Sequence, residues 1–129
     1  MDEPNAASVA LIRAGQVLLI ERAFEPFKGD WTLPGGRREP GETIEGCAIR
    51  EIGEELRLAI AELQPVMTME ISPRFRLAVF ATARFTGEIV ASAEIAAWAW
   101  VRPETIGMLR TTPDLDVALR RAFSLYELG

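Results

Sequence analysis

The chain has 129 residues, of which 14 are basic and 19 acidic, and its formal net charge is −5 at pH 7. This length predicts one domain spanning residues 1–129, and the acidic balance argues against a nucleic-acid polymer as ligand, because no surplus basic surface exists to meet a phosphate backbone. The sequence contains no histidine, which excludes the usual general base and zinc ligand and leaves acid–base work to carboxylates.

The cysteine count and the N-terminal residues allow a prediction of the cellular compartment. Cys47 is the sole cysteine, so no internal disulfide can form, which is typical of a reducing cytoplasm. The first residues, Met1 to Pro4, lack the apolar run of a signal peptide, and no apolar stretch approaches membrane-spanning length. We therefore expect a cytoplasmic protein that does not use a membrane as partner.

Two apolar runs at the start of the chain, Ser8 to Arg13 and Gln16 to Arg22, predict a β-hairpin because Ala14-Gly15 separates them. The second run is apolar at four successive positions, 17–20, which predicts a strand that is covered on both faces. The loop 23–30 follows with Phe27, an aromatic residue that could hold a nucleobase. The favoured alternative is that Phe24 and Phe27 anchor this loop on the core.

A glycine-rich loop follows the short strand predicted at 31–33. Gly35-Gly36 permits a sharp turn and a close approach by a ligand, and the Gly36 carbonyl is a candidate metal ligand. Arg37 and Arg38 lie in this loop and are candidates for binding substrate phosphate. The alternative is that both are solvated loop charges.

A helix is predicted from Thr43 to about Leu56, since Thr43 can cap its start and Glu45 falls in the first turn. Ile49, Ile52 and Leu56 lie on one stripe and are expected to face the core.

Three acidic residues on this helix share a face, because Glu51, Glu54 and Glu55 are spaced i, i+3 and i+4. Three like charges on one patch are expected to bind a cation, to pair with basic groups, or to raise a pKa. Carboxylate oxygens suit Mg²⁺ or Mn²⁺ better than zinc.

The spacing of these residues resembles the signature of the Nudix hydrolases, the MutT-like family. The match runs from Gly36 through Glu42, five residues later, to Arg50-Glu51-Ile52-Gly53-Glu54-Glu55-Leu56-Arg57-Leu58. The family has glycine where Arg57 stands. The helix therefore either ends in a strained left-handed cap at Arg57, at a cost of about 1 kcal/mol, or continues toward Leu63.

Further strands are predicted at 64–72, 74–86 and 93–101, with a break at Ser72-Pro73. Arg76 is a candidate contact for substrate phosphate, and the alternative is that it is a charged edge residue on a solvent-facing side of the strand. Trp98 and Trp100 share a face of the last strand and favour core packing or a homodimer interface over base stacking. A final helix is predicted to open at Thr112-Pro113-Asp114, with Thr112 as its cap and an apolar stripe along one face.

The order of elements predicts a mixed sheet held between helices, and the resemblance implies the Nudix-type α/β/α sandwich. It also implies Mg²⁺-dependent hydrolysis, with Mn²⁺ as a substitute, of the pyrophosphate bond in a small nucleotide, either a nucleoside triphosphate or an ADP-ribose-like nucleotide sugar. The alternative is a non-catalytic nucleotide-binding or sensor module on the same fold.

The resemblance also implies roles for individual residues. The metal ligands would be Glu51, Glu54 and Glu55, with the Gly36 carbonyl. The catalytic candidates are Arg50, Glu51, Glu54 and Glu94. In this set Arg50 would orient a neighbouring glutamate, and Glu94 would assist the metal or act as base. Glu88 is the reserve for Glu94, and either acid is alternatively a surface charge.

Overall fold

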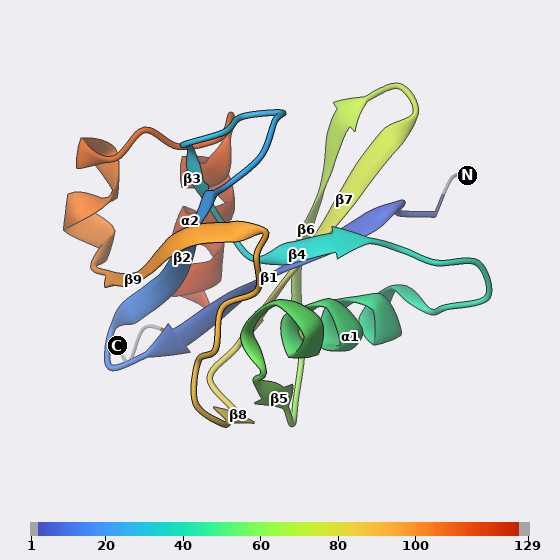
Figure 1. Cartoon of the computed structure of the whole chain (residues 1–129), viewed down its shortest axis with the longest axis horizontal. Helices are drawn as coiled ribbons and strands as arrows, with labels where there is room; N and C mark the ends of the chain where they lie inside the picture. The colour runs from blue at the N-terminus through green and yellow to red at the C-terminus, as the bar shows by residue number, and fades with distance from the viewer. Residues whose placement is uncertain (1–2, 127–129) are drawn as a thin grey trace.

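The architecture of this chain is a mixed β-sheet covered by a helix on each face, described here from a computed structural model of residues 3–126 (Figure 1). The strands are β1 (Ala6–Arg13), β2 (Gln16–Arg22), β3 (Trp31–Thr32), β4 (Gly35–Arg37), β5 (Ala59–Ile60), β6 (Gln64–Ser72), β7 (Phe75–Thr82), β8 (Phe85–Thr86) and β9 (Ile95–Val101). The helices are α1 (Ile44–Leu56), the 3-10 helix η1 (Pro103–Met108) and α2 (Leu115–Ser124).

Seven of the described strands form one sheet in the order β3-β2-β1-β7-β6, with β4 paired to β1 and β9 paired to β2. The β1–β7 pair is parallel, whereas the other pairs of this sheet are antiparallel. The two remaining strands, β5 and β8, make a separate antiparallel ribbon. The mixed sheet that the sequence predicts is therefore present.

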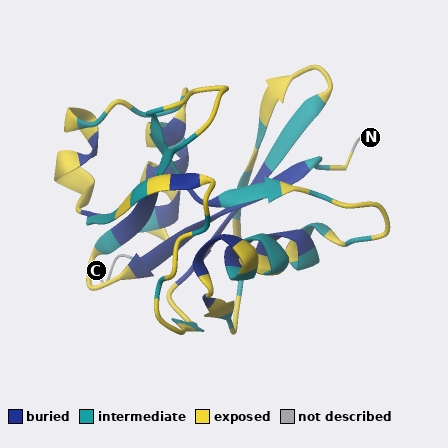
Figure 2. Ribbon diagram, viewed as in Figure 1, coloured by how far each residue is buried: buried dark blue, intermediate teal, exposed yellow. Residues whose placement is uncertain are grey.

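The side chains of β1 alternate between two apolar cores, one on each face of the sheet. Val9 and Leu11 pack with residues of α1, whereas Ala10 and Ile12 pack with residues of α2. Figure 2 shows the buried residues concentrated along the central strands and on the inner faces of both helices. This arrangement confirms the expected α/β/α sandwich.

The predicted hairpin is also present. Ala14 and Gly15 both have positive φ, at 53° and 75°, which matches the twist of a two-residue turn between β1 and β2. The four apolar residues that follow, 17–20, are all buried, as expected for a strand covered on both faces.

Two predicted boundaries are wrong. The strand predicted at 74–86 ends at Thr82, whose buried hydroxyl accepts a hydrogen bond from the Arg84 N–H at 2.9 Å, and the chain then turns so that β8 can pair with β5. The last helix is preceded by Asp114 in a left-handed conformation rather than capped by Thr112. The Thr112 hydroxyl bonds instead to the hydroxyl of Thr32.

Helix α1 also differs from expectation in the side that it buries. Ile52 and Leu56 are fully buried, but Ile49 is 44% exposed. The buried face is completed by Cys47 and Ala48, which pack against β1. Among the described residues, no helix is long and apolar enough to cross a membrane.

The end of α1 is the left-handed cap rather than a longer helix. Arg57 has φ 62° and ψ 29°, and its N–H donates to the Gly53 carbonyl at 3.1 Å. This conformation is sterically strained for any residue with a Cβ, whereas glycine adopts it without strain.

We expect Arg57→Gly to raise the free energy of unfolding by about 0.5–1 kcal/mol, because glycine relieves that cost and keeps the cap hydrogen bond. Urea denaturation monitored by circular dichroism measures the change. Arg57→Ala is the matched control, since it removes the same charge but keeps the Cβ and should give no gain. Equal stability of the glycine and alanine variants would contradict the argument.

Candidate active site

Helix α1 positions the acidic residues beside the glycine strand β4. The Thr43 hydroxyl caps the helix as predicted, accepting from the Gly46 N–H at 3.0 Å. The helix then packs its apolar face on β1 and β4. Because β4 is built from two glycines and Arg37, its backbone lies close to the helix side chains.

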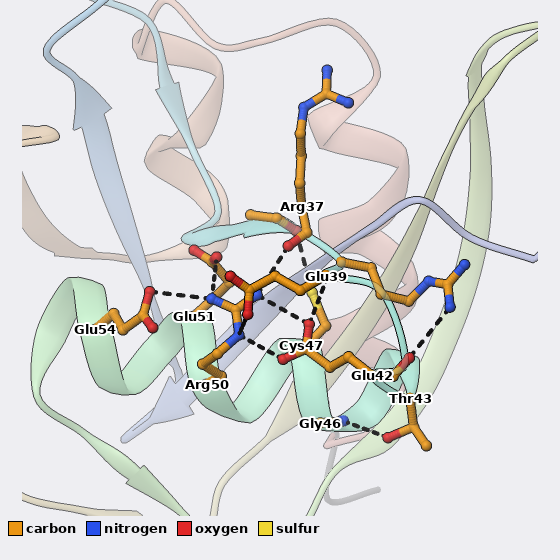
Figure 3. A network of polar contacts seen from close by, with 11 residues as sticks. Arg37, Glu39, Glu42, Thr43, Gly46, Cys47, Arg50, Glu51 and Glu54 are labelled. Carbon is orange, nitrogen blue, oxygen red and sulfur yellow. Dashed lines mark hydrogen bonds and ion pairs between the residues drawn. The ribbon is translucent and has the colours of Figure 1, made fainter.

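Arg50 is the centre of a network of carboxylates (Figure 3). Its Nε and Nη2 donate to the two oxygens of Glu42 at 2.5 and 3.0 Å, and its Nη1 donates to Glu51 at 2.8 Å and to Glu54 at 3.1 Å. Nη2 also donates to the Arg37 carbonyl at 3.0 Å, which ties β4 to the helix. We call Arg50, Glu42, Glu51, Glu54 and the Arg37 carbonyl the Arg50 network. A planar guanidinium suits this role because it offers several donors in a fixed geometry.

Glu55 lies apart from this network, in the protein interior. It is only 6% exposed, and its Oε1 accepts a hydrogen bond from the Gly35 N–H at 2.8 Å. Burial raises its pKa to about 8; the Gly35 hydrogen bond opposes this shift, while the nearby charges of Glu51 and Glu94 add to it. Burial also raises the pKa of Glu51, although Arg50 opposes that shift.

Glu94 is exposed in the turn before β9, not on the strand itself. Its backbone is held by hydrogen bonds to Ala23 and to the Ser92 hydroxyl. The tertiary structure brings this distant acid near the helix cluster, so its charge adds to the raised pKa of both Glu51 and Glu55.

Gly36 leaves room for the Glu51 carboxylate. A Cβ at position 36 would lie 2.2 Å from the Glu51 Oε1, so no other residue fits there without moving Glu51. The Gly36 carbonyl accepts a hydrogen bond from the Cys47 thiol at 3.5 Å and is therefore turned toward the helix.

The acidic residues fit a hard divalent cation in their chemistry. Their oxygens are ligands that Mg²⁺ or Mn²⁺ prefers, and burial, which raises the pKa of Glu51 and Glu55, leaves carboxylates whose charged form a cation would stabilise. Within residues 3–126, however, no three side chains of ligating type converge in a formed metal site. Arg50 holds Glu51 and Glu54 whereas Glu55 turns to Gly35, so the ligand set of Glu51, Glu54, Glu55 and Gly36 stays a prediction.

The four predicted substrate contacts have different surroundings. Phe27 is 46% exposed and Phe24 is 59% exposed, so neither side chain anchors its loop on the core. The Arg38 side chain donates hydrogen bonds to the carbonyls of Pro4 and Glu42. It therefore links the N-terminal segment to the loop that precedes α1.

The other two contacts, Arg76 and Arg37, lie near the β6–β7 hairpin. Arg76 lies 3.9 Å from Glu70 across this hairpin. Arg37 stacks over the ring of Phe75 and points away from the Arg50 network. Sequence reasoning missed Phe75, because only the register of the sheet brings β7 within reach of β4.

Glu42 provides a pH-dependent test of the Arg50 network. Its hydrogen bond from Arg50 and that from the Glu39 backbone lower its pKa from 4.5 to about 2. A lowered folded-state pKa adds stability that is present above the unfolded-state pKa and is lost as pH falls from about 4.5 toward 2. We expect Glu42→Gln to be less stable than wild type at neutral pH, and the difference to shrink across this range. Urea denaturation at several pH values measures it, and a pH-independent difference would contradict the assignment.

Comparison with known proteins adds three findings. A family model described as the NUDIX domain matches residues 2–123. Nucleoside triphosphatase NudI of Escherichia fergusonii is 32% identical over 128 residues, covering 86% of this chain and 87% of that protein. The crystal structure of a MutT NUDIX hydrolase from Burkholderia pseudomallei superposes with a TM-score of 0.83 at 26% identity, covering 93% of this chain and 98% of that one.

A shorter match is to the ADP-ribose pyrophosphatase of Methanocaldococcus jannaschii. It is 45% identical over 58 residues, which is 45% of this chain but only 34% of that protein. The chain thus matches about a third of the length of this relative.

Proposed function

Since this chain belongs to the Nudix family, as a MutT-like Nudix hydrolase, we propose that it hydrolyses a pyrophosphate bond in a nucleoside diphosphate derivative with a divalent metal ion as cofactor. The observation that carries the proposal is the Arg50 network, together with buried Glu55 beside the glycine strand. Mg²⁺ is the expected metal and Mn²⁺ its substitute.

Each acidic residue has a role in this proposal. Glu51, Glu54 and Glu55 would hold the metal, which would supply a Lewis acid that neutralises phosphate charge and activates water. Arg50 acts as a positioning residue, because its donors fix the carboxylates of Glu51 and Glu54. Glu94, near the same cluster, is the candidate base. The reaction consumes one water, forms a bond from its oxygen to phosphorus and breaks one phosphoanhydride bond.

A nucleoside triphosphate is the favoured substrate. The NudI relative, which bears the name nucleoside triphosphatase, matches the chain over most of both lengths. An ADP-ribose-like nucleotide sugar is the second candidate, supported by the shorter match to an ADP-ribose pyrophosphatase.

The test is a hydrolysis assay of the purified protein against nucleoside triphosphates, nucleotide sugars and dinucleotides, with Mg²⁺, with Mn²⁺ and with excess EDTA. We expect turnover of one substrate class with either metal and none with EDTA. Turnover that persists in EDTA would exclude the metal-dependent mechanism. If no compound of the panel is hydrolysed but nucleotide binding is measured by calorimetry, the result would support the alternative of a non-catalytic sensor module.

A further inference from the structure

Strand β9 is an open edge of the main sheet. It pairs with β2, and Figure 1 shows it in orange alongside that strand. Within residues 3–126 no strand pairs with its other side. The backbone groups on that side are therefore available to a strand from another chain.

The hydrogen bonds of β2 show which backbone groups of β9 face the open side. Arg22 bonds through both its N–H and its C=O to the loop on the β3 side of β2. Because backbone groups alternate between the two sides of a strand, Glu21 faces β9 and bonds to its partner there, Ala97. Alternation along β9 then directs the N–H and C=O of Trp98 and Trp100 away from the sheet.

The sequence of β9 does not protect this open side. Edge strands of native proteins usually carry charges, prolines or bulges that prevent pairing with another chain. Strand β6, at the opposite edge, has Pro65, Glu70 and two register shifts. Strand β9 reads Ile-Ala-Ala-Trp-Ala-Trp-Val, without charge or proline, and its one register shift lies before Ala97. Residues 97–101 thus form a regular, uncharged strand with a free edge.

The two ends of β9 carry opposite charges. Glu94 is exposed directly before the strand, and Arg102 is exposed directly after it. Neither side chain forms an ion pair with any residue that the structure describes. In an antiparallel pair of identical strands, the start of each strand lies beside the end of the other, so Arg102 meets the partner's Glu94 at both ends.

This complementarity favours a second copy of the chain as the occupant of the edge. With a net charge of −5, two copies repel each other over most of their surfaces. Along β9 that repulsion is replaced by an uncharged strand with an attractive ion pair at each end.

We propose that β9 is a homodimer interface, in which the β9 strands of two copies pair antiparallel about a two-fold axis beside Trp98. In this register the Trp98 N–H donates to the C=O of the partner's Trp98, and symmetry supplies the reverse bond. The small Ala96 lies opposite the partner's Trp100, and Arg102 lies beside the partner's Glu94. Trp98, which is 42% exposed in the single chain, is covered by the partner's Trp98 in an aromatic cross-strand pair.

The dimer joins each subunit to the active site of the other. Glu94 is the candidate base near the glutamates of α1, so each subunit contributes Arg102 to the surroundings of the partner's site. The interface is argued from strand pairing alone and does not depend on the proposed hydrolysis.

The first test measures the mass of the purified protein by sedimentation velocity over a range of concentrations, without substrate. The variants are Trp98→Lys and Arg102→Glu. Thr68→Lys is the matched control for the first, because Thr68 is exposed on the other edge strand, β6. Arg74→Glu is the control for the second, because Arg74 is exposed at the end of the β6–β7 hairpin. Far-UV circular dichroism checks that each variant is folded.

We expect wild type to reach twice the 14.3 kDa mass of the chain, and both controls to associate as wild type does. Trp98→Lys sets two like charges face to face, and Arg102→Glu makes both ion pairs repulsive, so each should raise the dissociation constant about tenfold or more. The charge swap Glu94→Arg with Arg102→Glu should restore association, which a merely destabilised protein would not show.

Two results of this experiment would overturn the proposal. The first is a wild type that stays monomeric at about 1 mM, where even a pair with a dissociation constant in that range would be largely associated. The second is a dimer that Thr68→Lys dissociates and Trp98→Lys does not, because that dimer would use β6 as its edge.

The second test checks the register by oxidative cross-linking. Trp98→Cys should form a disulfide with its copy in the partner, because paired residues of this kind lie about 5.5 Å apart at Cα, within disulfide range. Ala96→Cys is the control, since the two copies of residue 96 would lie about 13 Å apart along the paired strands. The natural Cys47 is buried and does not compete. Equal cross-linking of both variants on a non-reducing gel, or of neither, would refute this pairing.

Discussion

Glu54→Gln is expected to lower kcat/KM about a thousandfold while leaving the protein folded. A metal ion stabilises transition-state charge by several kcal/mol, and each 1.4 kcal/mol or so is about tenfold in rate, so loss of Glu54 as the proposed metal ligand should have an effect of this size. The side chain of Glu54 is 61% exposed, and its contact to Arg50 is an i, i+4 pair that contributes only about 0.3–0.5 kcal/mol to stability. The variant therefore separates catalysis from folding.

Initial rates in Mg²⁺ on the best substrate of the panel measure the effect, with a Mn²⁺ titration to follow metal affinity. Glu45→Gln is the matched control, since it makes the same charge change at an exposed position on the same helix, outside the Arg50 network. We expect it to keep the wild-type rate. A Glu54→Gln enzyme with more than a tenth of wild-type activity would remove Glu54 from the metal site.

Gly35→Ala is expected to lower the free energy of unfolding by about 3 kcal/mol or more. A Cβ at this position would lie 2.1 Å from the Ala7 carbonyl oxygen and 2.6 Å from the Ser8 Cα. Both atoms belong to the backbone of β1, so the clash can be relieved only by moving a central strand. Overpacking of this kind costs about 1–3 kcal/mol even where side chains can adjust.

Two other glycines serve as controls in the same denaturation experiment. Gly107→Ala places its methyl group where no atom lies within 4 Å and should be close to neutral. Gly36→Ala meets the Glu51 carboxylate, which is the end of a flexible side chain, so we expect this variant to lose more activity than stability. A Gly35→Ala protein as stable as Gly107→Ala would show that β4 and β1 lie far enough apart to accept a methyl group between them.

Local patterns determined the elements of the site. The Thr43 hydroxyl, the acid at 45 and the spacing of the three glutamates each act within one or two turns of α1, so their consequences follow from helix geometry alone. The same holds for the hairpin turn at Ala14-Gly15. Because these features are local, the Nudix signature around Arg50 could be recognised in the sequence. The family assignment that it implied is confirmed.

Long-range packing determined which side chains of α1 are buried, because the local patterns did not specify this. Whether Ile49 or Cys47 faces the core depends on how α1 docks on β1, because both residues lie near the border of its apolar face. Glu55 shares a helix face with Glu51 and Glu54 in sequence, yet docking buries it against Gly35 and raises its pKa.

The contacts that the side chains of Arg37 and Thr112 make could likewise not be predicted from the sequence. Arg37 stacks on Phe75 only because β4 and β7 flank β1 in one register, and Thr112 bonds to Thr32 across 80 residues of chain. The sequence by itself determined which acidic and basic groups α1 and its neighbouring loop bring together, because these groups lie within a few helical turns of one another. The tertiary structure decided on which side of the sheet each group lies, because strand register and helix docking depend on contacts between residues far apart in the chain.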